Sequence, residues 1–194
     1  MEFEEIDVSR ADTCLPIRTA CRELRSLKHQ WFTTVMDRNR VRSAWSDIDV
    51  QLTRRHDLVP RLVEAVKAYA EYERATLSAV TELRTRAEAA ERLPDKARLE
   101  DEMEAGLHRL IALAESYPTL KADGNFLQLQ RDLVDTEDQL QYARRYYNGA
   151  VRAYNTRIET FPDLAVAATF AFRPAEFFAV DEREIRAAPR VELA

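Results

Sequence analysis

The chain has 194 residues, of which 32% are charged and 46% are hydrophobic, and its formal net charge is −5. This length favours a single elongated domain, and the acidic balance argues against nucleic acid as a partner, because phosphate binding needs a basic surface. Three glycines are too few for the many tight turns of a β-sandwich, so the composition favours a helical protein.

The N-terminal residues do not match a targeting signal. The stretch from Met1 to Glu5 is acidic, and no run of about 18 apolar residues occurs in the sequence. If Cys14 and Cys21 share one helix, they lie about 10 Å apart along its axis, which excludes a disulfide. Free thiols fit a reducing compartment. We therefore expect a cytoplasmic protein, with attachment to a membrane surface as the alternative.

Five prolines divide most of the chain into helical windows. Proline breaks helix interiors but is accepted in a first turn or just past a helix end. The dividing residues are Pro16, Pro60, Pro94, Pro118 and Pro162. Each of the four windows carries apolar residues at helical spacing, which predicts four helices and an irregular tail. We expect an N-terminal arm at residues 1–15 and one helical domain at residues 16–194.

The first window predicts one continuous helix over residues 16–54, about 57 Å long. Its row alternates steps of three and four, as in a helix of a bundle or coiled coil. The members are Leu24, Leu27, Trp31, Thr34, Arg38, Val41, Trp45, Ile48 and Leu52. The first half is basic and could lie on an anionic membrane surface, although a solvated bundle face is the simpler interpretation. Leu27, Trp31 and Val35 then need a cover, and we rank the apolar tail or a second copy above a membrane.

The segment from Arg54 to Pro60 allows two interpretations. The favoured one is a reversal between two helices, with Asp57 as the N-cap and Pro60 in the first turn of the second helix. The alternative is one helix kinked at Pro60, because the apolar row continues through Arg55 to Val59. Two charged residues and a cap beside a proline favour the reversal.

The window from Asp123 to Pro162 predicts a long helix that organises the domain. Asp123 is its expected N-cap, and apolar residues recur at steps of three, four and seven. Polar residues on or beside its stripe join others from the first two windows in a predicted polar ladder. The ladder consists of Arg55, Asp57, Glu73, Glu137, Arg144, Asn148 and Asn155. We favour a buried, paired network that fixes helix register, and a ligand or proton site is the alternative.

Patterns for metal or nucleophilic chemistry are absent from the sequence. His29, His56 and His108 are scattered, and Glu104 precedes His108 by four residues, the wrong spacing for a di-iron bundle. There is no nucleophile elbow and no glycine-rich phosphate loop. We therefore expect no metal, no cofactor and no enzymatic activity.

The tail after Asp163 is apolar on all sides. This pattern predicts a short helix and then an extended strap on the other helices, because monomers rarely expose so large an apolar patch. We expect Phe170, Phe172, Phe177 and Phe178 to be largely buried.

A series of motifs, in order along residues 41–193, resembles the LemA family. The motifs are Arg54-Arg55-His56-Asp57-Leu58-Val59-Pro60-Arg61-Leu62-Val63, Val66-Lys67-Ala68-Tyr69-Ala70, Tyr117-Pro118-Thr119-Leu120-Lys121-Ala122, Asn125-Phe126-Leu127-Gln128-Leu129-Gln130, Arg144-Arg145-Tyr146-Tyr147-Asn148, Tyr154-Asn155, Phe161-Pro162, Phe177-Phe178 and Pro189-Arg190-Val191. The resemblance implies an antiparallel up-and-down four-helix bundle, a bacterial origin, an unsettled molecular role and, usually, an N-terminal membrane anchor.

This chain departs from the family pattern in several places. The anchor is not found, and residues 1–40 look like an amphipathic extension. Tyr72, Arg61 and Asp138 stand where the family usually has a histidine and two asparagines. These changes weaken the case for proton transfer by the polar ladder.

Together these observations favour a non-enzymatic helical scaffold or adaptor with an unknown protein partner, acting near a membrane surface or through self-association. The alternative is a small-molecule binder or enzyme that uses the buried network. The polar candidates are Arg54, Arg55, Asp57, Glu73, Glu137, Arg144, Asn148 and Asn155. The candidate motif aromatics and prolines are Pro60, Tyr69, Pro118, Phe126, Tyr147, Tyr154, Phe161, Pro162, Phe177 and Phe178.

Overall fold

The computed structural model describes residues 15–69 and 73–178, with side chains from residue 25 onward. The described residues contain six helices and no strand, which confirms the all-α class. The helices are α1 (Leu15–Lys67), α2 (Arg74–Ala89), α3 (Leu93–Glu115), α4 (Pro118–Lys121), α5 (Gly124–Glu159) and α6 (Asp163–Thr169). The predicted arm lies outside the described residues except for its last residue. Cys14, Tyr72 and the Pro189-Arg190-Val191 motif lie outside them too.

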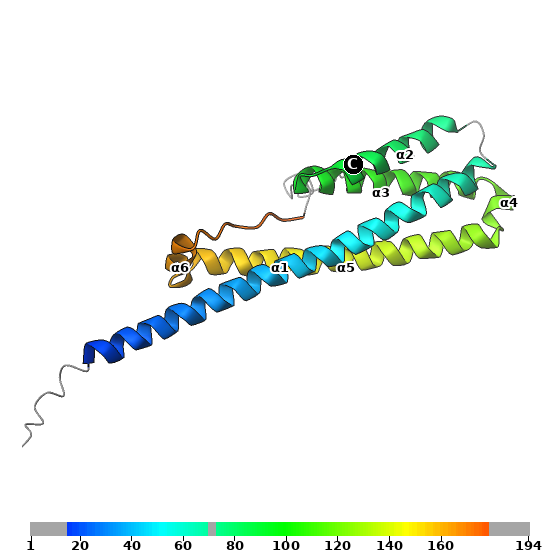
Figure 1. Cartoon of the computed structure of the whole chain (residues 1–194). Coiled ribbons are helices and arrows are strands. Elements are labelled where there is room, and N and C mark those ends of the chain that lie inside the picture. The colour runs from blue at the N-terminus through cyan, green and yellow to red at the C-terminus, as the bar shows by residue number, and fades with distance from the viewer. Residues whose placement is uncertain (1–14, 70–72, 179–194) are drawn as a thin grey trace, which may run out of the picture.

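The long helices lie roughly along one direction (Figure 1). α1 and α5 run antiparallel and pack against each other. α2 and α3 form a hairpin beside the C-terminal half of α1, and the short α4 joins α3 to α5. At the opposite end, α6 folds back onto α5 and α1. The N-terminal part of α1 extends beyond the other helices, so the molecule is elongated.

α1 continues through Pro60, so the predicted reversal at this residue is wrong. A proline in a helix interior costs about 3 kcal/mol, because it removes a hydrogen bond and crowds the preceding turn. Burial on both sides of the proline offsets this cost, since each fully buried aliphatic side chain contributes about 1.5–3 kcal/mol. Leu52, Val59, Leu62 and Val66 are each at most 2% exposed. Pro60 itself faces solvent.

The other predicted helix ends agree better with the structure. The continuous helix over residues 16–54 is confirmed as part of α1. Asp123 caps α5, because its Oδ1 accepts hydrogen bonds from the backbone N–H groups of Asn125 and Phe126, each at 2.9 Å. The first reversal lies instead between Lys67 and Arg74. No glycine or proline occurs there, so tertiary packing rather than a local turn motif decides its position.

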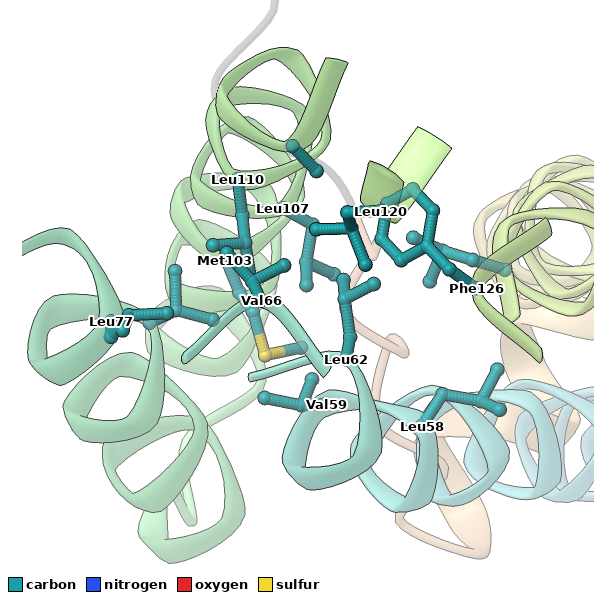
Figure 2. Packing of buried hydrophobic residues seen from close by; sticks show 13 residues of the cluster. Leu58, Val59, Leu62, Val66, Leu77, Met103, Leu107, Leu110, Leu120 and Phe126 are labelled. Atoms are coloured by element: carbon teal, nitrogen blue, oxygen red, sulfur yellow. The ribbon is translucent and has the colours of Figure 1, made fainter. Parts of the chain in front are cut away.

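Two apolar cores fill the interior. The distal core, near α4, consists of Leu58, Val59, Leu62, Val66, Leu77, Val80, Met103, Leu107, Leu110, Ala114, Leu120, Phe126 and Leu133. Figure 2 shows its side chains converging from α1 to α5. The proximal core, near α6, consists of Val41, Ala44, Ile48, Leu52, Ala97, Leu140, Tyr147, Ala150, Val151, Tyr154, Ile158, Ala167 and Phe178. Between the two cores lie the buried polar side chains of Arg55 and His56 on α1, Glu100 on α3 and Thr136 on α5.

The apolar tail forms the predicted short helix, α6, followed by the predicted extended segment. We call residues 172–178 the strap. Phe178 is buried, as predicted, and Phe172 is partly buried. The prediction is wrong for Phe170 and Phe177, which are 58% and 43% exposed. Successive side chains of an extended chain point to opposite sides, so Phe177 and Phe178 cannot both face the core.

Candidate functional site

A buried charged layer separates the two cores. Arg55 on α1 and the side chain of Glu100 on α3 are both 0% exposed. Arg55 Nη1 donates to Glu100 Oε2 at 3.3 Å and to the Glu100 backbone carbonyl at 3.4 Å. Arg55 Nη2 contacts the carboxylate of Glu137 on α5 and lies 3.8 Å from Glu104 Oε2. One guanidinium therefore joins α1, α3 and α5, and buried charges of this kind are tolerated only when they are paired.

His56 extends the charged layer to α2. Its Nε2 lies 2.8 Å from Glu100 Oε1, and its Nδ1 lies 3.6 Å from Glu88 Oε1. Glu88 Oε1 is also 3.0 Å from Nη2 of Arg84, which is one turn away on α2. All four long helices thus contribute charged or titratable groups to one connected set of contacts.

The charged layer holds more carboxylates than cations. Glu100, Glu104 and Glu137 all contact Arg55. Burial raises the pKa of Glu104 above its ordinary value of 4.5, and the neighbouring Glu137 carboxylate raises it further, while Arg55 acts in the opposite direction. Negative charge at Glu104 is therefore under-compensated, and an additional cation would be favourable at this point.

A cleft between α3 and α5 opens onto the charged layer. Its volume is about 850 Å³, within the range of known ligand sites. The apolar lining residues are Leu107 and Ile111 of α3 with Leu127, Leu133 and Val134 of α5. The polar lining residues are Glu104, His108, Gln130, Arg131, Asp135, Glu137 and Asp138. Because Glu104 and Glu137 belong to both cleft and layer, a bound group in the cleft can reach the charged layer from solvent.

Two asparagines of α5 hold the backbone of the strap. Asn148 Nδ2 donates to the Phe178 carbonyl at 3.0 Å, and its Oδ1 accepts from the Phe178 N–H at 2.9 Å. Asn155 binds the backbone of Ala175 in the same two-bond way, at 2.9 and 2.8 Å. Each side-chain amide therefore donates one hydrogen bond to the strap backbone and accepts one from it, as the backbone of a neighbouring β-strand would.

Two tyrosines of α5 bind the same stretch of backbone. The Tyr147 hydroxyl donates to the Glu176 carbonyl at 2.9 Å, and the Tyr154 hydroxyl donates to the Arg173 carbonyl at 3.0 Å. Seven residues of α-helix advance about 10.5 Å, and three residues of extended chain span about 10 Å. This match explains why residues seven positions apart on α5 bind the backbone of residues three positions apart on the strap.

Arg144 holds the end of the strap nearest the cleft. Its Nη1 donates to Asp101 Oδ1 of α3 at 2.9 Å, and its guanidinium carbon lies 5.1 Å from the centroid of the Phe178 ring. Trp45 of α1 packs on the same ring, with 5.6 Å between the centroids. Phe178 thus contacts α1 and α5 at the edge of the proximal core, and Arg144 links this contact to α3.

Comparison with known proteins identifies the family. The family model described as "LemA family" matches residues 44–193. The chain belongs to the LemA family. Magnetosome protein MamQ 2 of Paramagnetospirillum magneticum is 26% identical over 178 residues, which cover 78% of this chain and 65% of that relative. Protein LemA of Metamycoplasma hominis is 27% identical over 161 residues, which cover 77% of this chain and 73% of that relative.

The predicted polar ladder of this LemA-family chain divides into two separate groups. Arg55 and Glu137 meet in the charged layer, whereas Arg144, Asn148 and Asn155 hold the strap. Two further members, Asp57 and Glu73, are exposed, so their predicted place inside the bundle is wrong. Arg54 makes a surface ion pair with Asp135 at 3.3 Å.

The exposure of Asp57 and Glu73 has a simple origin. Asp57 does not cap a helix because α1 continues past it, and its side chain is on the opposite face from the buried row. Glu73 lies at the N-terminal end of α2 rather than within a helix. Both errors follow from the predicted reversal at Pro60, which shifted the start of the second helix by more than three turns.

The LemA motif aromatics and prolines also occupy different environments. Phe126, Tyr147, Tyr154 and Phe178 are buried, whereas Tyr69 and Phe161 are 43% and 80% exposed. Pro118 begins α4, and the Phe161–Pro162 peptide bond is cis. Tyr147 and Tyr154 hold the strap, Phe178 packs in the proximal core and Phe126 in the distal core, so the buried aromatics have a structural explanation.

Sequence reasoning missed three members of the charged layer, Glu100, Glu104 and His56. Glu100 and His56 are buried, at 0% and 6% exposure, although neither stands out from the many other charged residues nearby. One signal was available, because Leu99, Met103, Leu107 and Leu110 define a buried face on α3 and Glu100 adjoins it. Within the described residues, no group of three or more His, Cys, Asp and Glu side chains is arranged to hold a metal ion.

In the part of the chain that the structure describes, no helix combines the length and the apolar character needed to cross a membrane.

Proposed function

We propose that this LemA-family chain is a non-enzymatic helical scaffold that binds a protein partner, with its long helices arranged as an up-and-down four-helix bundle. The observation that carries this proposal is the shape and surface of α1. At 53 residues, α1 is about 80 Å long. Its C-terminal half lies in both cores, and its N-terminal end extends past the other helices. Between residues 27 and 36, α1 carries apolar side chains that are exposed to solvent.

The N-terminal half of α1 carries four large apolar side chains that are exposed to solvent. Phe32 and Met36 are 55% and 51% exposed, and Leu27 and Trp31 are 48% and 40% exposed. Phe32 and Met36, one turn apart, are on the opposite side of α1 from the buried Thr34. Leu27 and Trp31 lie on the Thr34 side of the helix, so the outward face carries the adjacent pair Phe32 and Met36. Exposed apolar neighbours rimmed by charged residues mark a candidate interaction site.

The rest of the molecule holds the N-terminal half of α1 in a fixed direction. Arg157 of α5 donates from Nε to Asp37 Oδ2 of α1 at 2.6 Å. The rings of Trp31 and Phe170 lie 6.3 Å apart, which brings the end of α6 against α1. The two-bond contacts of Asn148 and Asn155 with the strap secure the adjacent edge of the proximal core. A rigid arm with an apolar face fits the role of a scaffold.

The proposal is tested by capturing partners of the full chain from its native host. The variant Phe32→Glu with Met36→Glu changes the exposed face without touching either core. Val50→Glu is a matched control, because Val50 is an exposed apolar residue of the same helix, at 62%. We expect the double variant to lose a partner that the wild type and the control retain. Equal recovery by all three proteins would contradict a role for this face.

A small-molecule binder or enzyme is the second candidate, and the cleft between α3 and α5 favours it. Glu104, whose pKa burial raises, lies at the junction of the cleft and the charged layer. Such a carboxyl group could bind an amine or exchange a proton. A thermal-shift screen with small organic amines, repeated on Glu104→Gln, separates this candidate from the first. Stabilisation of the wild type that is lost in the variant would favour it.

A further inference from the structure

We propose that the partner of the N-terminal half of α1 is a second copy of the same chain, which receives the outer face of this half in the cleft between α3 and α5. This inference rests on the proposed scaffold function and names its partner. Two surfaces of the molecule carry it, one apolar and basic, the other apolar and acidic. They lie on different parts of the chain and fit each other chemically.

The cleft offers an apolar floor with an acidic border. Leu107, Leu133 and Val134 are among its apolar lining residues, and Val134 is 59% exposed. Glu104, Asp135, Glu137 and Asp138 line it together with Arg131 and His108. Asp135 also pairs with Arg54, and Glu104 and Glu137 share Arg55, so the border carboxylates still outnumber the adjacent arginines. Behind the border, Glu100 adds a further carboxylate to the charged layer. A basic, apolar segment is the complementary ligand.

The outer face of α1 supplies such a segment. Phe32 and Met36 are its exposed apolar residues, and the exposed cations Arg25, Lys28 and Arg40 lie within two turns of them. An amphipathic helix that lays its apolar face in a groove is a common mode of protein recognition, with anchors one turn apart. The cations would then lie against the acidic border of the cleft.

The two surfaces cannot meet within one molecule. From Phe32 to Arg55, which lies at the level of the cleft, α1 rises about 35 Å in a continuous helix. Contact therefore needs a second copy, and it joins unlike surfaces of the two copies. Such a head-to-tail contact leaves one free surface at each end, so it adds further copies to form chains or closed rings. A membrane could cover the α1 face but would leave the acidic cleft unfilled.

The head-to-tail geometry gives the experiment a specific form. The face variant is Phe32→Glu with Met36→Glu, and the cleft variant is Val134→Arg with Asp138→Arg. All four residues are exposed, so both proteins should fold, as circular dichroism checks. Val50→Glu is the control for the face variant. Tyr142→Arg is the control for the cleft variant, because Tyr142 is 64% exposed on α5 and does not line the cleft.

Sedimentation velocity over a concentration series measures the result. We expect the wild type and both controls to associate beyond the dimer, and each variant alone to associate at least about tenfold more weakly. An equimolar mixture of the two variants should form a dimer and nothing larger, because one intact face and one intact cleft remain. Association should also weaken as salt rises, since charge complementarity contributes to it.

Three results would overturn the inference. They are a wild type that stays monomeric at every concentration, variants that associate as the wild type does, and a mixture that forms no dimer. If the wild type is monomeric but the face variant still loses a captured partner, self-association fails while the scaffold function stands. If the wild type is monomeric and its binding to anionic vesicles needs Phe32 and Met36, the partner is a membrane surface.

Discussion

The replacement of Arg55 by alanine tests the buried charged layer most severely. Arg55 pairs with Glu100, whose side chain is also 0% exposed, and it contacts the carboxylates of Glu104 and Glu137. Its removal leaves these carboxylates next to one another without their shared cation. Loss of one partner from a buried ion pair costs about 3–5 kcal/mol, because the remaining charge is uncompensated.

The size of the chain converts this cost into a temperature. The entropy of unfolding is about 2.1 cal/mol/K per residue, or about 0.4 kcal/mol/K for this chain. A loss of 3–5 kcal/mol should therefore lower Tm by about 7–12 °C. Differential scanning calorimetry measures Tm, and urea titration measures the free energy of unfolding independently.

The neighbouring residue provides the control. Arg54 pairs with Asp135 at 3.3 Å, but their side chains are 48% and 57% exposed. Exposed pairs contribute about 1 kcal/mol or less, so Arg54→Ala should lower Tm by no more than about 3 °C. Adding Glu100→Gln to Arg55→Ala should recover part of the loss, because it removes an unpaired buried charge. Equal melting of Arg54→Ala and Arg55→Ala would refute the account of the charged layer.

Three further predictions follow from the same contacts. Burial raises the pKa of Glu104 in the folded protein above its ordinary value of 4.5, so ionisation of this carboxyl group destabilises the fold as pH rises above 4.5. Glu104→Gln should therefore raise Tm at neutral pH, and this gain should disappear as pH falls to about 4.5. A gain that persists or grows in acid would contradict this. Asn148→Ala should cost about 1–3 kcal/mol from two lost hydrogen bonds, and hydrogen exchange at the Phe178 amide should accelerate. Unchanged protection would show that the strap is held elsewhere. Phe178→Ala should cost about 3–5 kcal/mol by urea titration, whereas the half-exposed Phe177→Ala should cost under about 1 kcal/mol.

Helix content and the longest helical segments could be predicted because they depend on local patterns. The unbroken apolar row of residues 16–54 predicted that part of α1, and the Asp123 side chain predicted the start of α5. Both signals come from residues within a few positions of each other. The LemA motifs also predicted the family, and the family match over residues 44–193 confirms it.

The position of the first reversal could not be read locally. Pro60 looked like a break, yet the buried row through Leu52, Val59 and Val66 outweighs the single lost hydrogen bond. The actual reversal, between Lys67 and Arg74, contains residues that favour helix. Its place depends on the packing of α2 against α3, which is a property of the whole fold.

The site was only half predictable for a similar reason. Arg55 and Glu137 stood out because they interrupt apolar stripes, but Glu100 is one charged residue among many on α3. Its burial depends on facing Arg55, 45 positions away in the sequence. The roles of Asn148 and Asn155 were equally hidden, because their partners are backbone atoms of the strap, which carry no sequence signal.

Site-specific photocrosslinking in living cells of the native host tests the proposed scaffold role most directly. A photoreactive residue at position 32 replaces the exposed Phe32, and the same residue at position 50 replaces the exposed Val50 as the control. The account predicts a protein adduct from position 32 but not from position 50, with crosslinked peptides that include Val134 of another copy. The absence of any protein adduct from position 32 above the level at position 50 would contradict it.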